Sequence, residues 1–368
     1  MQYLLIMKRK KGEKRMGKII KRILLGILIV ILLAVVIVLA GAWSIFGDKV
    51  KAAGSVKEID KNLYYMEYKG DYGFDAYLEQ GGASSTAEMA AYITDFLSGG
   101  FMNKVPSMGK MNFGCTAYTV KTAEGGALMG RNYDWDGENG TAMIVYTEPE
   151  NGYASYSTCW LDFLGFGDGW KPEGMPNQYM SLAAIYVPLD GINEKGLAIA
   201  DLMVGDDEQT NQKTDKVDLT TTSAIRLLLD KAATVDEAIA LLEQYDMHSD
   251  IGRGHHLAIS DANGKAVVVE YIDNIMYVTE TPVVTNHYLT EGEKYGVGND
   301  ESHARLNRVL AMDEEVGSVM DASRVRDVMQ KVSYADATQW SIVFDMENKA
   351  LDFYWQRKFD APHHFEIK

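Results

Sequence analysis

The chain has 368 residues and an acidic balance, with 36 Lys and Arg against 52 Asp and Glu. This length is sufficient to bury one large core or two medium ones. Nine basic residues and one acid precede residue 23, so the remainder carries 27 basic and 51 acidic residues, a net charge of −24. A surface of that sign repels nucleic acid, which excludes a nucleic-acid partner.

The N-terminal region contains a long apolar run over residues 23–46, none of them charged. A helix that rises about 1.5 Å per residue is long enough over this run to cross a hydrocarbon core of about 30 Å. We therefore predict a single transmembrane helix over 23–46, with the lipid bilayer as a partner. The basic residues before it predict a cytoplasmic tail over 1–22 and an extracytoplasmic location for the rest. A cleaved signal peptide is the alternative, but its apolar region is typically only about 7 to 15 residues long, which favours an uncleaved anchor.

Helix and strand patterns alternate along the rest of the chain. Residues 47–114 predict a linker with one or two strands, followed by an amphipathic helix over 86–97 that Gly99-Gly100 stops. Strand blocks that flank helix pairs predict an α+β layered domain. The further expected elements are a hairpin over 115–135, strands at 143–147, 180–187 and 196–203, two helices within 220–245, strands at 256–260, 266–271 and 276–279, helices at 302–313 and 323–332, and strands at 341–345 and 350–354.

The hairpin begins at Cys115 and ends in the run Arg131-Asn132-Tyr133-Asp134-Trp135. With a turn centred on Glu124-Gly125, Asp134 is expected to face Cys115 across the ladder. A lone cysteine is more often a small core residue than a nucleophile. A thiol close to an Arg and an Asp nevertheless has the ingredients of an activated nucleophile, because a nearby cation favours the thiolate.

Further segments make Cys115 part of a longer pattern. The chain resembles the choloylglycine hydrolase family of linear amide C–N hydrolases, which includes bile salt hydrolases and penicillin V acylases. The segments that carry the resemblance run in the family's order: Cys115-Thr116, Gly130-Arg131-Asn132-Tyr133-Asp134-Trp135, Asn193-Glu194-Lys195-Gly196-Leu197-Ala198, Val284-Thr285-Asn286, and Ser302, Arg305 and Arg308.

The resemblance implies an N-terminal-nucleophile hydrolase with a four-layer αββα sandwich over 115–368. Its thiol attacks an amide carbonyl, and its own α-amine, which titrates near pH 7.7 to 8.0, serves as the base. By the same resemblance, Cys115, Arg131, Asp134, Asn286 and Arg305 are the catalytic residues. Asp134 would orient the amine, Arg131 would lower the thiol pKa, and Asn286 would stabilise the oxyanion. The α-amine exists only after the Gly114–Cys115 bond is cut, so we predict self-cleavage and a propeptide segment within 47–114.

The expected partner is a small-molecule N-acyl amide, with no cofactor and no metal. Met203 stands where bile salt hydrolases carry an asparagine and penicillin V acylases a tyrosine, so it is expected to shape the substrate pocket. Trp160 and Phe163, in a glycine-rich aromatic segment, are further candidates for substrate binding. Adjacent residues on a strand point to opposite faces, so His255-His256 is interpreted as structural rather than as a metal pair. Cys115 and Cys159 could pair, but a nucleophile must be free.

Hydrolysis of a linear amide is the favoured function. Acyl transfer through the same acyl-cysteine intermediate is an alternative, because an amine can resolve the intermediate as well as water can. A catalytically silent, membrane-anchored binding protein is the third possibility. For either enzyme function, the active domain is expected outside the cell membrane. The sequence does not specify an oligomeric state.

Overall fold

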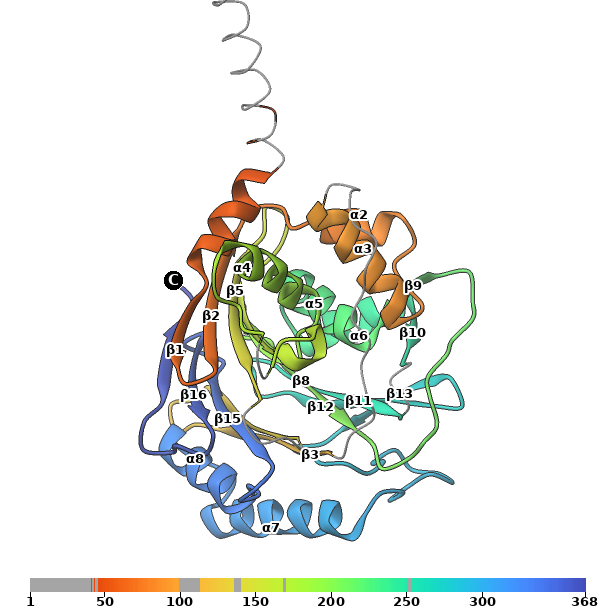
Figure 1. Cartoon of the computed structure of the whole chain (residues 1–368). Coiled ribbons are helices and arrows are strands. Elements are labelled where there is room, and N and C mark those ends of the chain that lie inside the picture. Colours follow the sequence, from red (N-terminus) through yellow and green to blue (C-terminus); the bar gives the residue numbers. More distant parts are fainter. Residues whose placement is uncertain are drawn as a thin grey trace, which may run out of the picture. The chain divides into compact units, whose positions relative to one another are not determined.

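The computed structural model describes residues 41, 43, 46–98, 113–135, 140–167, 170–249 and 253–368. Contacts divide the chain into a unit of residues 1–50 and a unit of residues 51–368. The second unit contains all the helices and strands discussed below (Figure 1).

The predicted membrane location is corrected by the structure. Nearly all of residues 23–46, the predicted span, lie outside the described residues. Within the residues that are described, every helix is too short or too polar to cross a bilayer. The prediction of a single-pass membrane protein, with the bilayer as a partner and an extracytoplasmic domain, is therefore wrong. It rested on the hydropathy of residues 23–46 and on the basic residues before them.

Two large β-sheets and one small sheet form the framework of the described residues. The two large sheets pack against each other, and helices cover their outer faces, which confirms the predicted mixed α+β sandwich. The nine-stranded sheet has the order β1 (Lys57–Asp60), β2 (Leu63–Lys69), β5 (Ala142–Glu148), β6 (Ser155–Trp160), β7 (Asp190–Asn193), β8 (Ala198–Met203), β11 (His255–Ser260), β12 (Ala266–Ile272) and β13 (Ile275–Glu280) in the described chain.

The second large sheet carries the hairpin that begins at Cys115. In the part of the chain that the structure describes, its six strands have the order β14 (Val283–Val284), β3 (Phe113–Lys121), β4 (Ala127–Trp135), β15 (Thr338–Asp345), β16 (Ala350–Trp355) and β17 (His363–Glu366). Strand β4 is buried along its whole length, because one face meets the other sheet and the opposite face meets a helix. The short strands β9 (Val217–Thr220) and β10 (Tyr245–His248) pair in parallel.

Helices pack on the outer face of each large sheet. On the nine-stranded sheet, α5 (Thr221–Lys231) contacts β7 and β8, and α6 (Val235–Leu242) packs against α5. On the six-stranded sheet, α7 (Asp300–Val316) contacts β3, and α8 (Ala322–Lys331) contacts β4 and β15. Thr220 and Thr234 cap the N-termini of α5 and α6 by accepting from backbone N–H groups, which satisfies donors that a helix start leaves free. Further helical segments among the described residues are α2 (Phe74–Glu79), α3 (Thr86–Ser98), η1 (Leu161–Leu164), α4 (Met175–Met180) and η2 (Ser181–Tyr186). The strand predicted over 180–187 is wrong, because η2 occupies most of these residues. A short, buried apolar run does not distinguish a strand from a helical segment by its periodicity.

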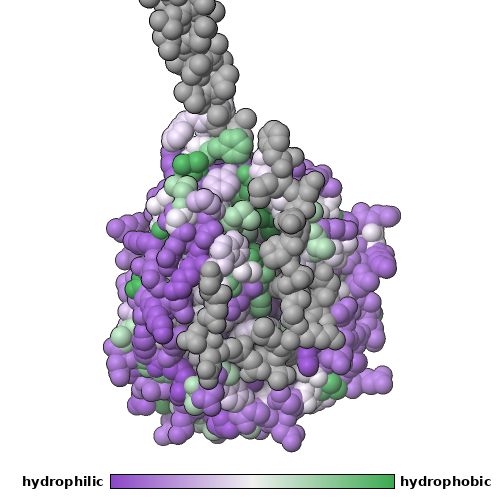
Figure 2. Space-filling model, viewed as in Figure 1, coloured by the Kyte–Doolittle hydropathy of each residue, from purple (hydrophilic) through white to green (hydrophobic). Residues whose placement is uncertain are grey.

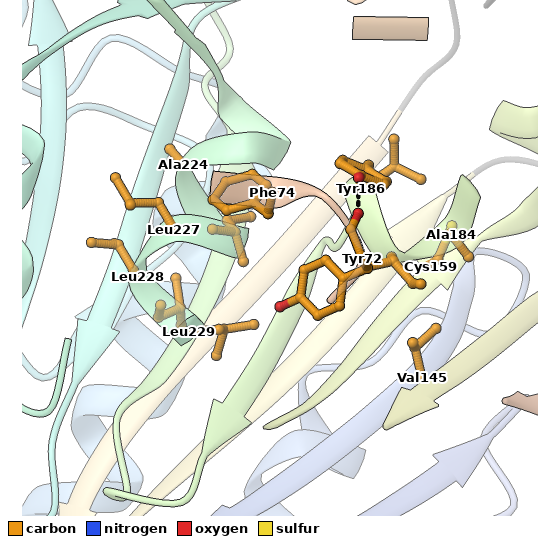
Figure 3. Close-up of a cluster of buried hydrophobic side chains, with 14 of the residues drawn as sticks. Tyr72, Phe74, Val145, Cys159, Ala184, Tyr186, Ala224, Leu227, Leu228 and Leu229 are labelled. Carbon is orange, nitrogen blue, oxygen red and sulfur yellow. Dashed lines mark hydrogen bonds between the residues drawn. The ribbon is translucent and has the colours of Figure 1, made fainter. Parts of the chain in front are cut away.

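The segment before Cys115 is built into the same core as the segment after it. Strand β2 pairs in parallel with β5 from Leu63 to Lys69. The Tyr72 hydroxyl donates to the Asp230 carboxylate at 2.6 Å, and Tyr186 donates to the carbonyl of Tyr72. Figure 3 shows Tyr72 and Phe74 lying beside the leucines of α5. Residues 57–98 are therefore part of the folded unit, and α3 confirms the helix predicted over 86–97.

The visible face of the molecule is mainly hydrophilic. Hydrophilic residues cover most of the coloured face in Figure 2, apart from scattered apolar patches.

Candidate active site

The β3–β4 hairpin places Cys115 opposite Tyr133, at a buried position near the start of β3. The sequence predicted Asp134 at that position, so the register differs by one residue. The reason is the turn, in which the Thr122 N–H donates to the Gly126 carbonyl at 2.9 Å and centres the loop on Glu124. Because side chains alternate along a strand, this register sends Cys115, Arg131 and Tyr133 toward the other sheet and Asp134 toward the helices.

Arg131 is fully buried between the two sheets. Its Nε donates to Asp190 Oδ2 at 3.2 Å and its Nη2 donates to the Asp201 carbonyl at 2.7 Å. Burial raises the pKa of the Cys115 thiol, while the Arg131 guanidinium opposes that rise and Asp134 adds to it. Arg131 thus acts in the predicted direction on the thiol pKa, but burial outweighs it in the uncleaved chain.

Asp134 lies on the opposite face of β4, next to Gly114. Its Oδ1 accepts from the Thr338 hydroxyl, and its Oδ2 is buried without a hydrogen-bond partner among the described residues. A Cβ on Gly114 would lie 3.3 Å from that Oδ2 and 3.0 Å from the Tyr334 ring. An acceptor without a hydrogen bond among the described residues therefore lies next to Gly114, at the peptide bond whose cleavage the sequence predicts.

Asn286 and Arg305 close the site around the backbone of Cys115. The Cys115 N–H donates to Asn286 Oδ1 at 2.6 Å, and Arg305 Nη2 donates to the same oxygen at 2.7 Å. Arg305 Nη1 donates to the Cys115 carbonyl and to Thr116 Oγ1, and lies 3.7 Å from Asp134 Oδ2. Asn286 Nδ2 donates to the Met203 carbonyl at 2.7 Å. The five residues predicted as catalytic are thus brought together.

A small cavity of about 30 Å³ lies against the thiol. It is lined by Cys115, Tyr133, Trp135, Phe163, Leu189, Asp201, Met203 and His255. Met203 and Phe163, two of the three predicted substrate-binding residues, therefore line the same cavity as Cys115. The third, Trp160, is not among the lining residues and packs instead against Tyr133, Trp340 and Trp355 in the core between the sheets.

Several residues at the site were missed by the sequence reasoning. Asp190 pairs with Arg131, Thr338 donates to Asp134, and the Tyr334 ring lies under the Arg305 guanidinium at 5.2 Å. They come from β7, β15 and the segment before β15, far from Cys115 in the chain. No local motif marks these residues. The only sequence signal for any of them is the acidic Asp190 next to an apolar strand segment, where a buried charge needs a partner.

Cys159 and the histidines do not form a second reactive cluster. Both cysteines are free thiols, and Cys159 is buried in the core on the far side of the nine-stranded sheet. His256 uses both ring nitrogens, one with Glu270 Oε1 at 2.9 Å and one with the Thr285 carbonyl at 2.7 Å. Within the described residues, no group of three His, Cys, Asp or Glu side chains could hold a metal ion.

The titration of Asp134 gives a prediction for stability. Burial raises the pKa of Asp134 from 3.8 to about 6, although Arg305 acts in the opposite direction. The unfolded chain therefore loses this proton at lower pH than the folded chain, so stability should fall as pH rises from 4 to 6, by about 3 kcal/mol in total. Urea unfolding of an uncleaved Cys115→Ala protein across pH 4 to 7 measures this fall.

The control is the Cys115→Ala, Asp134→Asn double variant, whose amide cannot titrate. Its stability should lack this component of the pH dependence. Identical pH profiles for the two proteins would contradict the prediction.

Comparison with known proteins identifies the family. Residues 121–359, well over half of the chain, match the family described as acyl-coenzyme A:6-aminopenicillanic acid acyl-transferase. The chain belongs to this family. A penicillin V acylase from Pectobacterium atrosepticum is 26% identical over 159 residues, which cover 40% of this chain and 40% of that protein. The chain thus matches about 40% of the length of this curated relative.

One solved structure supports the fold. A mutant conjugated bile acid hydrolase from Clostridium perfringens superposes with a TM-score of 0.50 at 17% identity, over 69% of this chain and 92% of that chain. Penicillin V acylase from Agrobacterium tumefaciens gives a TM-score of 0.48 at 19% identity, over 69% and 86% of the two chains. The resemblance stated from the sequence is confirmed by the family match and by the penicillin V acylase relative, and the fold is shared with the conjugated bile acid hydrolase. The family match begins at residue 121 and so does not include Cys115.

Proposed function

We propose that this protein hydrolyses the linear amide bond of a small N-acyl compound, with Cys115 as nucleophile and its own α-amine as base. One observation carries the proposal. The backbone nitrogen of Cys115, which becomes the α-amine on cleavage, is held by Asn286. The preceding Gly114 lies beside a buried oxygen of Asp134 that has no hydrogen-bond partner among the described residues and has Arg305 Nη1 3.7 Å away. A carboxylate at that position can accept a hydrogen bond from an amine and orient it toward the thiol. The two sheets with helices on their outer faces fit the four-layer αββα arrangement that the sequence predicted.

Self-cleavage precedes this activity. The Cys115 thiol attacks the Gly114 carbonyl carbon, the peptide C–N bond breaks as the nitrogen takes a proton, and a thioester joins Gly114 to Cys115. Water then hydrolyses the thioester, which leaves a carboxylate on Gly114 and a free α-amine on Cys115. Gly114 suits this step because any side chain there would press against Tyr334 and Asp134.

Turnover follows the same chemistry on an external amide. The thiol attacks the amide carbonyl while its proton passes to the α-amine, and that proton leaves with the departing amine. Water hydrolyses the resulting thioester and releases the acid. The Asn286 side chain has a second N–H beyond the one donated to Met203, and we assign it to the oxyanion; such donors are typically worth about 2.7 to 4 kcal/mol.

The experiment that tests this function uses the purified full chain on a panel of N-acyl amides, next to Cys115→Ser. The expected result is acid release by the wild type and a mature chain that begins at Cys115. If the protein releases no acid from any amide and Cys115 never becomes a terminus, the hydrolase proposal fails.

The N-terminal piece is expected to remain bound after cleavage. Strands β1 and β2 lie in the nine-stranded sheet, and Tyr72 is hydrogen-bonded to Asp230 in the core. Helix α3 supplies Met89, Ala90 and Ile93 to an apolar cavity close to the nucleophile. Separating the two pieces would expose this apolar surface to water, which is unfavourable in proportion to its area.

We therefore predict that the two fragments of a cleaved chain elute together in size exclusion under native conditions and separate only in denaturant. Intact-mass spectrometry of the eluted peak identifies them, with the uncleaved Cys115→Ala protein of 40.9 kDa as the control. An uncleaved 40.9 kDa protein with full amidase activity would contradict the processing scheme.

Acyl transfer is the second candidate, and the description of the matched family favours it. The same acyl-cysteine intermediate would then be resolved by an amine in place of water. Product analysis with a competing amine separates the two, because a transferase gives a new amide and a hydrolase gives the free acid. A binding protein without catalysis would give neither product, and its ligand binding would survive Cys115→Ala.

A further inference from the structure

The cavity beside Cys115 adjoins a second, larger cavity. The second cavity has a volume of about 80 Å³ and shares Phe163, Leu189, Asp201 and His255 with the first. The surface of its wall is mainly apolar, with Met89 and Ile93 of α3 among the lining side chains, and it also contains four threonines, Ser249 and His248. An apolar acyl group attached to Cys115 would therefore extend past the four shared residues, which we call the throat.

One side chain in the throat has an unused polar atom. His255 is about 5% exposed, and its Nδ1 lies 2.8 and 3.0 Å from the two carboxylate oxygens of Asp201. Its Nε2 is buried and has no hydrogen-bond partner among the described residues. A buried polar atom without a partner is unfavourable, so such an atom in a cavity wall indicates a group that it binds.

Asp201 determines what Nε2 can do. An ionised carboxylate only accepts hydrogen bonds, so the ring proton lies on Nδ1. In the neutral ring Nε2 is then an acceptor, and in the protonated ring it is a donor. A hydroxyl group both donates and accepts, so it is the simplest group that satisfies Nε2 in either state.

Strand alternation separates this histidine from its neighbour. His255 and His256 are adjacent on β11 and point to opposite faces, and His256 is saturated by Glu270 and Thr285. His255 instead sits across from Met203 in the β8–β11 ladder, at the nucleophile's cavity. The interpretation of the pair as structural therefore fits His256 and leaves His255 unexplained.

We propose that the Asp201–His255 pair recognises a hydroxyl group close to the scissile carbonyl of an otherwise apolar acyl substrate. The hydroxyl binds His255 Nε2 in the throat, and the remaining chain occupies the apolar cavity. This assignment rests on the proposed amide hydrolysis, because that reaction attaches the acyl group to Cys115 and so directs it toward the throat.

The test compares two amides that differ by one hydroxyl, the 3-hydroxydecanoyl and decanoyl amides of glycine. The wild type should show a kcat/KM at least about tenfold higher for the hydroxylated amide. His255→Leu should bring this ratio close to one, and His255→Gln, which retains a polar atom, should restore part of it. Using the ratio cancels any general loss of active protein. A ratio that His255→Leu leaves unchanged, or a wild type without preference, overturns the proposal.

Binding to an uncleaved protein tests the same contact without turnover. Tryptophan fluorescence of Cys115→Ala reports binding of 3-hydroxydecanoate and decanoate, because Trp135 lines the nucleophile's cavity. The hydroxylated acid should bind more tightly, and the difference should disappear in the double variant Cys115→Ala, His255→Leu.

If no amide is hydrolysed but this difference in binding is found, the proposed function fails and the recognition site stands. If amides are hydrolysed without any difference, only the recognition site fails. If neither hydrolysis nor a difference in binding is found, both proposals fail.

Discussion

Replacing Cys115 with Ala is expected to abolish amide hydrolysis and to leave the Gly114–Cys115 bond intact. Both reactions need the same thiol, so one substitution should remove both. The loss in kcat should be at least about a thousandfold, since removing the nucleophile of a hydrolase leaves only the contribution of binding and of the oxyanion donors. Acid release from an N-acyl amide gives the first readout, and intact mass gives the second.

The matched control is Cys159→Ala. Cys159 is also a fully buried free thiol, but it packs in the core beyond the nine-stranded sheet, away from Arg131 and Asp134. This variant should retain cleavage and turnover at a modest cost in stability. If Cys115→Ala retained turnover while Cys159→Ala lost it, the nucleophile would be misassigned.

Replacing Arg131 with Leu is expected to destabilise the fold and to make the thiol less reactive. Arg131 and Asp190 form an ion pair at 3.2 Å in which both side chains are fully buried. Breaking a buried pair leaves an uncompensated charge and typically costs about 3 to 5 kcal/mol. Loss of the guanidinium also removes the nearest charge that favours the thiolate, so the pKa of Cys115 should rise further. Urea unfolding and the rate of thiol alkylation against pH measure the two effects.

A second buried ion pair supplies the comparison. Arg226 and Asp230 lie 2.7 Å apart on α5, almost fully buried, and contact Tyr72 rather than Cys115. Arg226→Leu should destabilise the protein by a similar amount and should not change the pH dependence of Cys115 alkylation. Equal shifts of that profile in both variants would show that the thiol responds to general loosening of the fold and not to Arg131.

The hairpin shows how far local sequence signals reach. The turn residues and the alternating strands predicted β3 and β4 and brought Arg131 and Asp134 close to Cys115. The predicted register was wrong by one residue, because the strand pattern on both sides of the turn is compatible with either register. The hydrogen bonds between Thr122 and Gly126 in the turn determine which register forms. That single residue moves Asp134 from the thiol's face to the face that contains Gly114 and Arg305.

The long-range part of the site came from resemblance and not from pattern. Asn286 is 171 residues from Cys115, and no periodicity connects them. Asp190 and Thr338, which hold Arg131 and Asp134, belong to no motif and were not found. The unused nitrogen of His255 could not be predicted either, since whether a ring nitrogen has a partner depends on what lies across the strand.

The sequence by itself determined most of the local elements, the α+β class, the acidic composition and the order in which Cys115, the hairpin and the distant polar residues occur. These depend on propensity, turn chemistry and composition, which act over a few residues. Only the tertiary structure decided the register of the hairpin, the partners of Arg131 and Asp134, and the inclusion of residues 57–98 in the nine-stranded sheet. These depend on which strands become neighbours, and contacts between distant segments are selected by the packing of the whole core rather than by any one segment.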